Sequence, residues 1–194
     1  MIDMEKEIMT EKSITINNQN KLTAKDIAQI GMMIAIIEVC KAAFAGIPNV
    51  ELTSFWIIIF TIYFGRKILF VIPAFILIEG MMYGFGLWWI MYLYAWPLLA
   101  LVTWKLRKMN SAISYSILSG AFGLLFGLLC SLPYIFIGSA GADLAAGLHT
   151  AFAWWIAGIP WDLVHGVANF FIMLILYHPI MRVMKLVRNE NLSE

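Results

Sequence analysis

Charged residues are scarce in this chain of 194 residues. Only 13% of the residues are charged and 62% are hydrophobic, whereas soluble domains contain about 25% charged and 45–50% apolar residues. The composition therefore excludes an ordinary soluble domain and predicts an integral membrane protein. The net charge of +1 lies in small clusters between apolar runs, a distribution that gives no basis for nucleic-acid binding.

An apolar signal segment is also missing from the beginning of the chain. Residues 1–23 are polar and of mixed charge, without the apolar core of a signal peptide, and we expect a disordered cytoplasmic tail. Cysteine is rare as well: Cys40 and Cys130 each fall inside an apolar run. Both are expected to be buried thiols rather than a disulfide.

Several catalytic motifs are absent. The chain has no GxxxxGK[ST] phosphate loop, no HExxH zinc motif and no GxSxG nucleophile motif. We therefore expect no ATP hydrolysis or other catalysis by this chain, and no resident metal or cofactor. The segment 138–141 (GSAG) with a downstream histidine suggests an intramembrane serine protease, but its serine is displaced from that family's GxSG arrangement.

Six apolar runs predict an all-α membrane protein with six transmembrane helices in one domain over 24–187, followed by a tail at 188–194. The runs are 25–46, 52–65, 68–85, 87–104, 112–138 and 160–181. The second run has 14 residues and is short for a helix that needs about 20 to cross the hydrocarbon. Pro160 suits the first turn of the last helix. Residues 139–159 are expected outside, either as a short interfacial helix carrying Trp154 and Trp155 or as a plain aromatic belt.

Basic residues set the orientation. With six crossings and cytoplasmic N- and C-termini, twelve of the thirteen Lys and Arg residues fall on the cytoplasmic side, as the positive-inside rule requires. These twelve are Lys6, Lys12, Lys21, Lys25, Arg66, Lys67, Lys105, Arg107, Lys108, Arg182, Lys185 and Arg188. The exception is Lys41, which we expect at membrane depth.

Ionisable groups within the apolar runs predict a binding pocket. Charged side chains inside a membrane are costly and usually functional. Under the predicted orientation, they all belong to the outer half or outer edge of their spans: Glu38, Lys41, Glu79, Asp162 and His165, with Asn169 alongside. The last three are spaced i, i+3, i+7 and share one helical face. The alternative is a buried ion-pair network, in which Lys41 neutralises Glu38 or Glu79 and Asp162 pairs with His165.

Aromatic side chains are concentrated in the fourth run. Trp88, Tyr92 and Trp96 repeat at i, i+4, i+8, and their flat faces suit a planar or ring-bearing ligand. We expect Trp88 and Tyr92 to lie nearest the outer mouth and Trp96 to contribute less. The alternative is that these rings only fill the core and anchor the interface. In the fifth run, Gly120, Gly123 and Gly127 predict close helix packing.

Small residues line the first helix. Ala24, Ala28, Gly31 and Ala35 fall within about 60° of one another around the helix, which lets another backbone approach closely. The helix leads into an irregular segment at 46–51 that carries Asn49 and Glu51. We therefore expect a partner-docking face at one end of this element and substrate contacts at the other.

Together these features resemble the substrate-binding S component of an energy-coupling factor (ECF) transporter. The small residues at Ala24-x-x-x-Ala28 and Gly31-x-x-x-Ala35 resemble the AxxxA docking motif, the segment IPNVELTSF is similar to the ligand-contacting first loop, and GIPWDLVHGVANF resembles the entry to the last helix. The resemblance covers nearly the whole chain after residue 24. It implies a multi-pass protein of a prokaryotic plasma membrane that captures a vitamin or related micronutrient from outside. It also implies a transmembrane T component and two ATPase subunits as partners.

A cobalamin-type ligand is the first candidate, followed by a queuosine precursor or another B vitamin. The expected substrate-binding residues are Lys41, Asn49, Glu51, Glu79, Trp88, Tyr92, Asp162, His165 and Asn169. The alternative function is a stand-alone oligomeric small-molecule transporter, which would need polar residues through the cytoplasmic half of the bundle. These are scarce.

Overall fold

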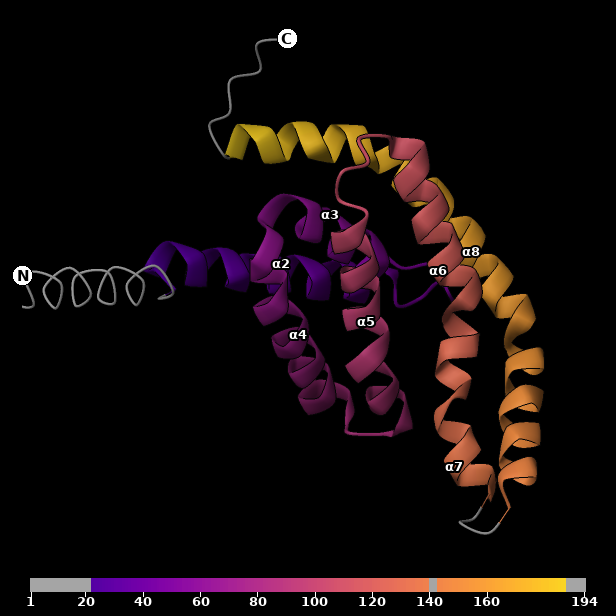
Figure 1. The fold of residues 1–194 in the computed structure, drawn as a ribbon. Coiled ribbons are helices and arrows are strands. Elements are labelled where there is room, and N and C mark those ends of the chain that lie inside the picture. Colours follow the sequence, from indigo (N-terminus) through magenta and orange to yellow (C-terminus); the bar gives the residue numbers. More distant parts are fainter. Residues whose placement is uncertain (1–21, 140–142, 188–194) are drawn as a thin grey trace, which may run out of the picture.

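The computed structural model describes residues 22–139 and 143–187, and this part of the chain is helical without a strand (Figure 1). Of the predicted tails at 1–23 and 188–194, residues 1–21 and all of 188–194 lie outside the described residues. The α-helices are α2 (Ala24–Phe44), α3 (Thr53–Phe64), α4 (Ile68–Tyr83), α5 (Leu87–Lys105), α6 (Ala112–Ser131), α7 (Pro133–Ser139) and α8 (Leu144–Val187). A single 3₁₀ turn, η1 (Gly65–Lys67), joins α3 to α4.

The first described helix starts where a local cap fixes it. The Thr23 hydroxyl accepts a hydrogen bond from the Asp26 backbone N–H at 3.2 Å, and the Asp26 carboxylate accepts one from the Thr23 backbone N–H at 2.9 Å. This reciprocal capping box satisfies two N–H groups that would otherwise lack partners. The boundary between tail and helix predicted at residue 24 therefore has a physical cause.

Within the described residues, five helical segments are long and apolar enough to cross a membrane. They are Ala24–Phe44, Thr53–Tyr83, Leu87–Lys105, Ala112–Gly138 and Leu144–Leu186. The prediction of six crossings is not confirmed, because α3 has only 12 residues. At 1.5 Å per residue it is about 18 Å long, and nine of its residues are buried, as expected of a core helix rather than an independent span.

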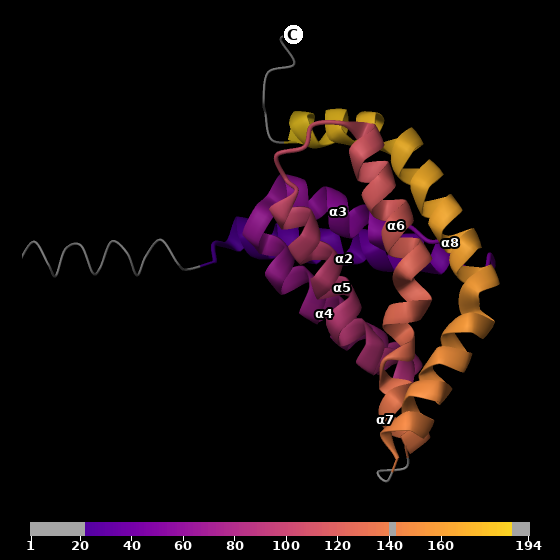
Figure 2. The same cartoon turned by 45° about the vertical axis from the view of Figure 1, so that its right-hand side comes forward.

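The helices form two units around α3. In both views α2 runs across the direction of α4, α5 and α6 rather than alongside them (Figures 1 and 2). The α4–α5 hairpin lies on one side, and α6 with α7 pairs with α8 on the other. Two long-range hydrogen bonds hold α5 in place: Trp89 Nε1 donates to the Ile76 carbonyl of α4 at 2.8 Å, and the Tyr94 hydroxyl donates to the Leu129 carbonyl of α6 at 2.7 Å.

The last helix corrects the prediction for residues 139–159. α8 is continuous from Leu144 to Val187, so Pro160 lies in a helix interior instead of the first turn. The expected short interfacial helix is not a separate element, because its residues from Leu144 onward belong to α8. Pro179, also inside α8, removes one backbone hydrogen bond and favours a kink. Beyond the bend, the end of α8 runs across the top of the molecule (Figures 1 and 2).

Glycines permit the close approach of α6 and α8, as the sequence predicts. A Cβ on Gly123 would come within 2.8 Å of the Gly166 Cα, and one on Gly120 within 3.2 Å of the Gly166 carbonyl oxygen. Because a backbone cannot give way as a flexible side chain can, only glycine fits at Gly123. This contact fixes the height at which α8 passes α6.

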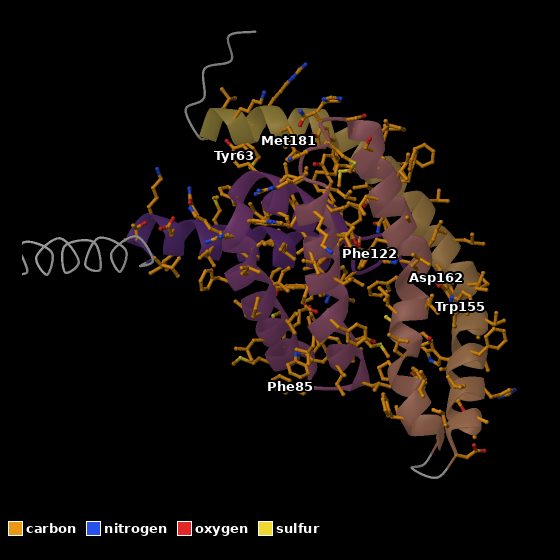
Figure 3. The ribbon with its side chains drawn as sticks, viewed as in Figure 1. Tyr63, Phe85, Phe122, Trp155, Asp162 and Met181 are labelled. Atoms are coloured by element: carbon orange, nitrogen blue, oxygen red, sulfur yellow. The ribbon has the colours of Figure 1, made fainter. Side chains whose placement is uncertain are left out.

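Basic segments gather at the end of the molecule where α8 terminates. The α5–α6 connection and the C-terminal end of α8 both lie at the top of Figure 1, and the Tyr63 hydroxyl of α3 donates to the Met184 carbonyl there. Figure 3 shows Tyr63 and Met181 at this end and Phe85, in the α4–α5 turn, toward the opposite end. The basic segments and the α4–α5 turn thus lie toward opposite ends of the molecule, in agreement with the charge bias of the sequence. The orientation in the membrane stays a prediction.

Candidate functional site

Two adjoining hollows form the candidate site, and we call them together the Lys41 cavity. The first, of about 360 Å³, is lined by Lys41, Ala45, Glu79, Tyr83, Trp88 and Tyr92. The second, of about 260 Å³, is lined by Lys41, Phe44, Ala45, Ile47, Pro48, Asn49, Val50, Glu51, Thr53, Tyr92, Trp96, Phe126 and His165. The walls therefore come from α2, the α2–α3 loop, α3, α4, α5, α6 and α8. Another hollow of about 430 Å³ between α4 and α5 has apolar walls apart from Arg66 and offers little specific chemistry.

The cavity contains a buried ion pair. Lys41 is in the last turn of α2, and its ammonium contacts the carboxylate of Glu79 on α4. The Glu79 side chain is fully buried, whereas 28% of the Lys41 side chain is exposed. Of the two partners that the sequence left open for Lys41, the structure pairs it with Glu79. Glu38, one turn earlier on α2, has a buried Oε1 atom without a hydrogen-bond partner.

Aromatic rings surround the Lys41 ammonium. Its Nζ atom lies 5.2 Å from the ring centre of Tyr92, 5.4 Å from that of Tyr83, and 5.9 Å from those of Phe75 and Trp88. Each distance is within the range of about 6 Å for a cation–π interaction. Trp88 and Tyr92, predicted from their spacing, therefore contact the same charged group. Tyr83 and Phe75 were not predicted.

The α2–α3 loop closes another wall through Glu51. The Glu51 carboxylate accepts hydrogen bonds from the Ser54 backbone N–H at 3.0 Å and the Ser54 hydroxyl at 2.5 Å, and His165 Nε2 of α8 donates to it at 3.1 Å. Burial alone would raise the pKa of Glu51, but these hydrogen bonds and the charge of His165 outweigh it and lower the pKa below its ordinary value. Glu51 is therefore an ionised carboxylate that holds the α2–α3 loop against α8. Its oxygen atoms already accept hydrogen bonds from Ser54 and His165. Asn49, also in this loop, has a φ of 57°, which Asn tolerates better than most residues.

Trp96 contributes more than its sequence position suggested. It is 2% exposed and lines the second hollow beside Phe126. Its buried Nε1–H has no hydrogen-bond partner, although tryptophan usually finds one when buried. The i, i+4, i+8 repeat with Trp88 and Tyr92 is the sequence signal that places it on the same face of α5. Phe126 carried no such signal.

Two predicted residues do not line the cavity. Asp162 lies on α8 partway along its pairing with α6 (Figure 3), and its Oδ1 atom accepts a hydrogen bond from the Gly127 backbone N–H at 2.9 Å. Asn169 is 1% exposed, and neither atom of its amide group has a partner. The alternative pairing of Asp162 with His165 is not the one observed, because His165 donates to Glu51. The shared helical face brought only His165 to the cavity wall.

The predicted docking face is open. Its four small residues are all exposed: Ala24, Ala28, Gly31 and Ala35. A Cβ added at Gly31 would meet nothing within 4 Å. The opposite face of α2 buries Met33 and Ile37 against the core.

Metal-ligating groups are dispersed in the described part of the chain. Within residues 22–139 and 143–187, no three His, Cys, Asp or Glu side chains are close enough to hold a metal ion together. Cys40 and Cys130 are free thiols. The side chains that line the Lys41 cavity offer charge pairing, hydrogen bonding and aromatic ring faces.

Comparison with known proteins adds no relative. No family model matches the chain, and neither the curated proteins nor the solved structures compared with it include a match.

Proposed function

We propose that this chain is the membrane-embedded substrate-binding subunit of an ECF-type importer, which captures a vitamin or related micronutrient from outside and delivers it with a T component and two ATPases. One observation carries the proposal: seven of the nine residues expected to bind substrate line one cavity. These are Lys41, Asn49, Glu51, Glu79, Trp88, Tyr92 and His165. A cavity with apolar and aromatic walls and a few convergent polar groups is the usual form of a small-molecule site.

The core beyond the cavity supports a binding subunit over a stand-alone channel. α3 begins at Thr53, in the cavity wall, and ends at Phe64, next to the basic turn η1. Between them Phe55 and the run 57–60 are apolar and no more than 1% exposed. A channel would need a polar path here, because dissolved ions and polar substrates must keep partners along their route.

The exposed small-residue face of α2 supports a docking partner. Transmembrane helices associate closely through small residues, and in this chain the four small residues of this face are exposed, with open space beside Gly31. Since the chain carries no phosphate-binding loop, energy for transport would come from the partner complex. The same helix carries Lys41 at its other end, so that docking and substrate binding share one element.

Native mass spectrometry of the protein extracted gently from its host tests the proposal. We expect one small molecule per chain, released on denaturation, and co-purification with a membrane subunit and two ATPases. Tyr92→Ala should lose the small molecule, whereas Tyr134→Ala, which removes a ring stacked on Trp154 away from the cavity, should retain it. A wild-type protein that carries no small molecule and no partners would overturn the proposal in favour of the small-transporter alternative.

A further inference from the structure

The Lys41 ammonium occupies a site built for a cation. Four ring centres lie 5.2–5.9 Å from its Nζ atom, and the fully buried Glu79 carboxylate contacts it. Aromatic cages of this kind recognise alkylammonium groups, because the negative faces of the rings attract positive charge. In the structure the cage holds an ammonium from the protein itself.

The charge balance around the cavity favours a second cation. Among the described residues that line the two hollows, Lys41 is the only Lys or Arg. It faces Glu79 directly and interacts electrostatically with Glu38 and Glu51. Glu51 is engaged by Ser54 and His165, which leaves two carboxylates for one ammonium.

Glu38 gives Lys41 an alternative partner. The two residues are three apart on α2, a spacing at which helical side chains are neighbours, and the buried Glu38 Oε1 atom accepts no hydrogen bond. Lysine has a flexible stem, and this one is partly exposed. Lys41 can therefore leave Glu79 for Glu38 without losing a carboxylate partner.

We propose that the Lys41 cavity binds a ring-bearing organic cation, whose positive nitrogen replaces the Lys41 ammonium between the aromatic rings and Glu79 while Lys41 moves to Glu38. This inference rests on the proposed binding function and narrows its substrate class. It requires no bond to form or break. The opposing hypothesis is an anionic ligand that pairs with Lys41 while Lys41 stays between the aromatic rings and Glu79.

Matched probes distinguish the two charges in the wild-type protein. Benzyltrimethylammonium and its neutral isostere neopentylbenzene have the same shape and differ in charge, and benzoate supplies an anion. Binding is measured by calorimetry and thermal shift on the full chain in detergent. We expect the cation to bind about tenfold or more tightly than the neutral isostere, and benzoate to bind more weakly than either. Equal binding of the cation and its isostere, or preference for benzoate, would overturn the proposal.

Substituting Lys41 should change ligand affinity in opposite directions for a cationic and for an anionic ligand. In Lys41→Met the cage is vacated and Glu79 is left without its ammonium, so benzyltrimethylammonium should bind about tenfold more tightly than to the wild type. If Lys41 instead holds an anionic ligand, the same variant loses binding. Lys67→Met is the control, because it removes an ammonium paired with Asp26 at 2.6 Å at the other end of α2 and should leave probe binding unchanged.

Two further variants keep the test decisive if Lys41→Met does not fold. Glu79→Gln should weaken cation binding about tenfold, and Glu38→Gln should weaken it several-fold by removing the alternative partner of Lys41. Unchanged cation binding in both would contradict the exchange.

The ligand released from the host protein separates this inference from the proposed function. A stoichiometric neutral or anionic compound would retain the binding function and overturn the cation inference. A stoichiometric cation would support both. If the protein from its host carries no small molecule and no partners, and the wild type binds no probe, both the proposed function and the cation inference are overturned.

Discussion

His165 Nε2 donates a hydrogen bond to Glu51 Oε1 at 3.1 Å across 114 residues of sequence. The contact joins the α2–α3 loop to α8 at the wall of the Lys41 cavity. Both residues line the second hollow, so this hydrogen bond fixes the wall of the hollow that the loop supplies.

Protonation of Glu51 at acidic pH should weaken the hydrogen bonds that hold the α2–α3 loop against α8. The pKa of Glu51 is held below its ordinary value of 4.5 by hydrogen bonds that outweigh the effect of burial. A carboxyl with a lowered pKa stabilises the fold fully above its ordinary pKa, and this contribution is lost as pH falls through the lower, folded value. We expect the thermal stability of the wild type to decrease from about pH 5 downward.

Glu51→Gln tests this assignment. At pH 7 the variant should be less stable by about 1–2 kcal/mol, since hydrogen bonds to a charged group are lost. The difference between wild type and variant should shrink as pH falls below 5, measured by thermal unfolding in detergent at each pH. A difference that stays constant down to pH 3 would show that the Glu51 charge does not stabilise the fold.

The contact of α6 with α8 predicts a large cost for one methyl group. Gly123→Ala would place a Cβ 2.8 Å from the Gly166 Cα, and overpacking of this kind costs about 1–3 kcal/mol. Gly31→Ala is the matched control, because its Cβ would meet nothing within 4 Å and alanine is the better helix former by about 1 kcal/mol. Unfolding measurements should therefore move in opposite directions for the two variants. A neutral Gly123→Ala would contradict the close packing.

Apolar runs bounded by basic or glycine-rich breaks were enough to predict several helices. The run 87–104 became α5 at Leu87–Lys105, and 25–46 became α2 at Ala24–Phe44. The last helix was predicted wrongly at its start because Pro160 gives the same local signal at a first turn and within a helix that tolerates it. What distinguishes the two cases is the pairing of α8 with α6 and α7, which is a tertiary property.

The part of the candidate site that the sequence predicted consists of charged residues in apolar runs, because burying a charge is costly. Lys41 and Glu79 are charged residues in apolar runs, and a charge is buried only with a partner, so the sequence alone marked them. The contact of Glu51 with His165 depends on the path of a loop over 114 residues, and no local pattern specifies it. For Asp162 the helical face was read correctly, but that face turns toward the backbone of Gly127 because glycine leaves room there.

The exposed stripe on α2 predicts a separation of docking from binding. Ala28→Trp or Gly31→Trp should abolish transport and complex formation with the T component, because a large ring prevents close helix approach. Both positions are exposed, so substrate affinity of the isolated subunit should change less than twofold. Ile175→Trp, at an apolar α8 position that is 67% exposed, is the control and should transport normally. Equal loss of binding and transport would contradict the separation.

Replacing Trp96 should preserve or raise the stability of the ligand-free protein and lower its affinity for ligand. Its Nε1–H is buried without a partner at the wall of the second hollow, and an unsatisfied buried donor destabilises a fold by about 1–3 kcal/mol. Trp96→Phe removes the donor while keeping an aromatic ring, so the ligand-free protein should be equally or more stable. A ligand that accepts a hydrogen bond from Trp96 should bind about tenfold more weakly to the variant.

Thermal unfolding and calorimetry with the ligand from the host protein measure the two effects. Trp89→Phe serves as the control, because the Trp89 N–H already donates to Ile76. That control should lose stability and retain affinity. If both variants lose stability and neither loses affinity, Trp96 is only a core residue.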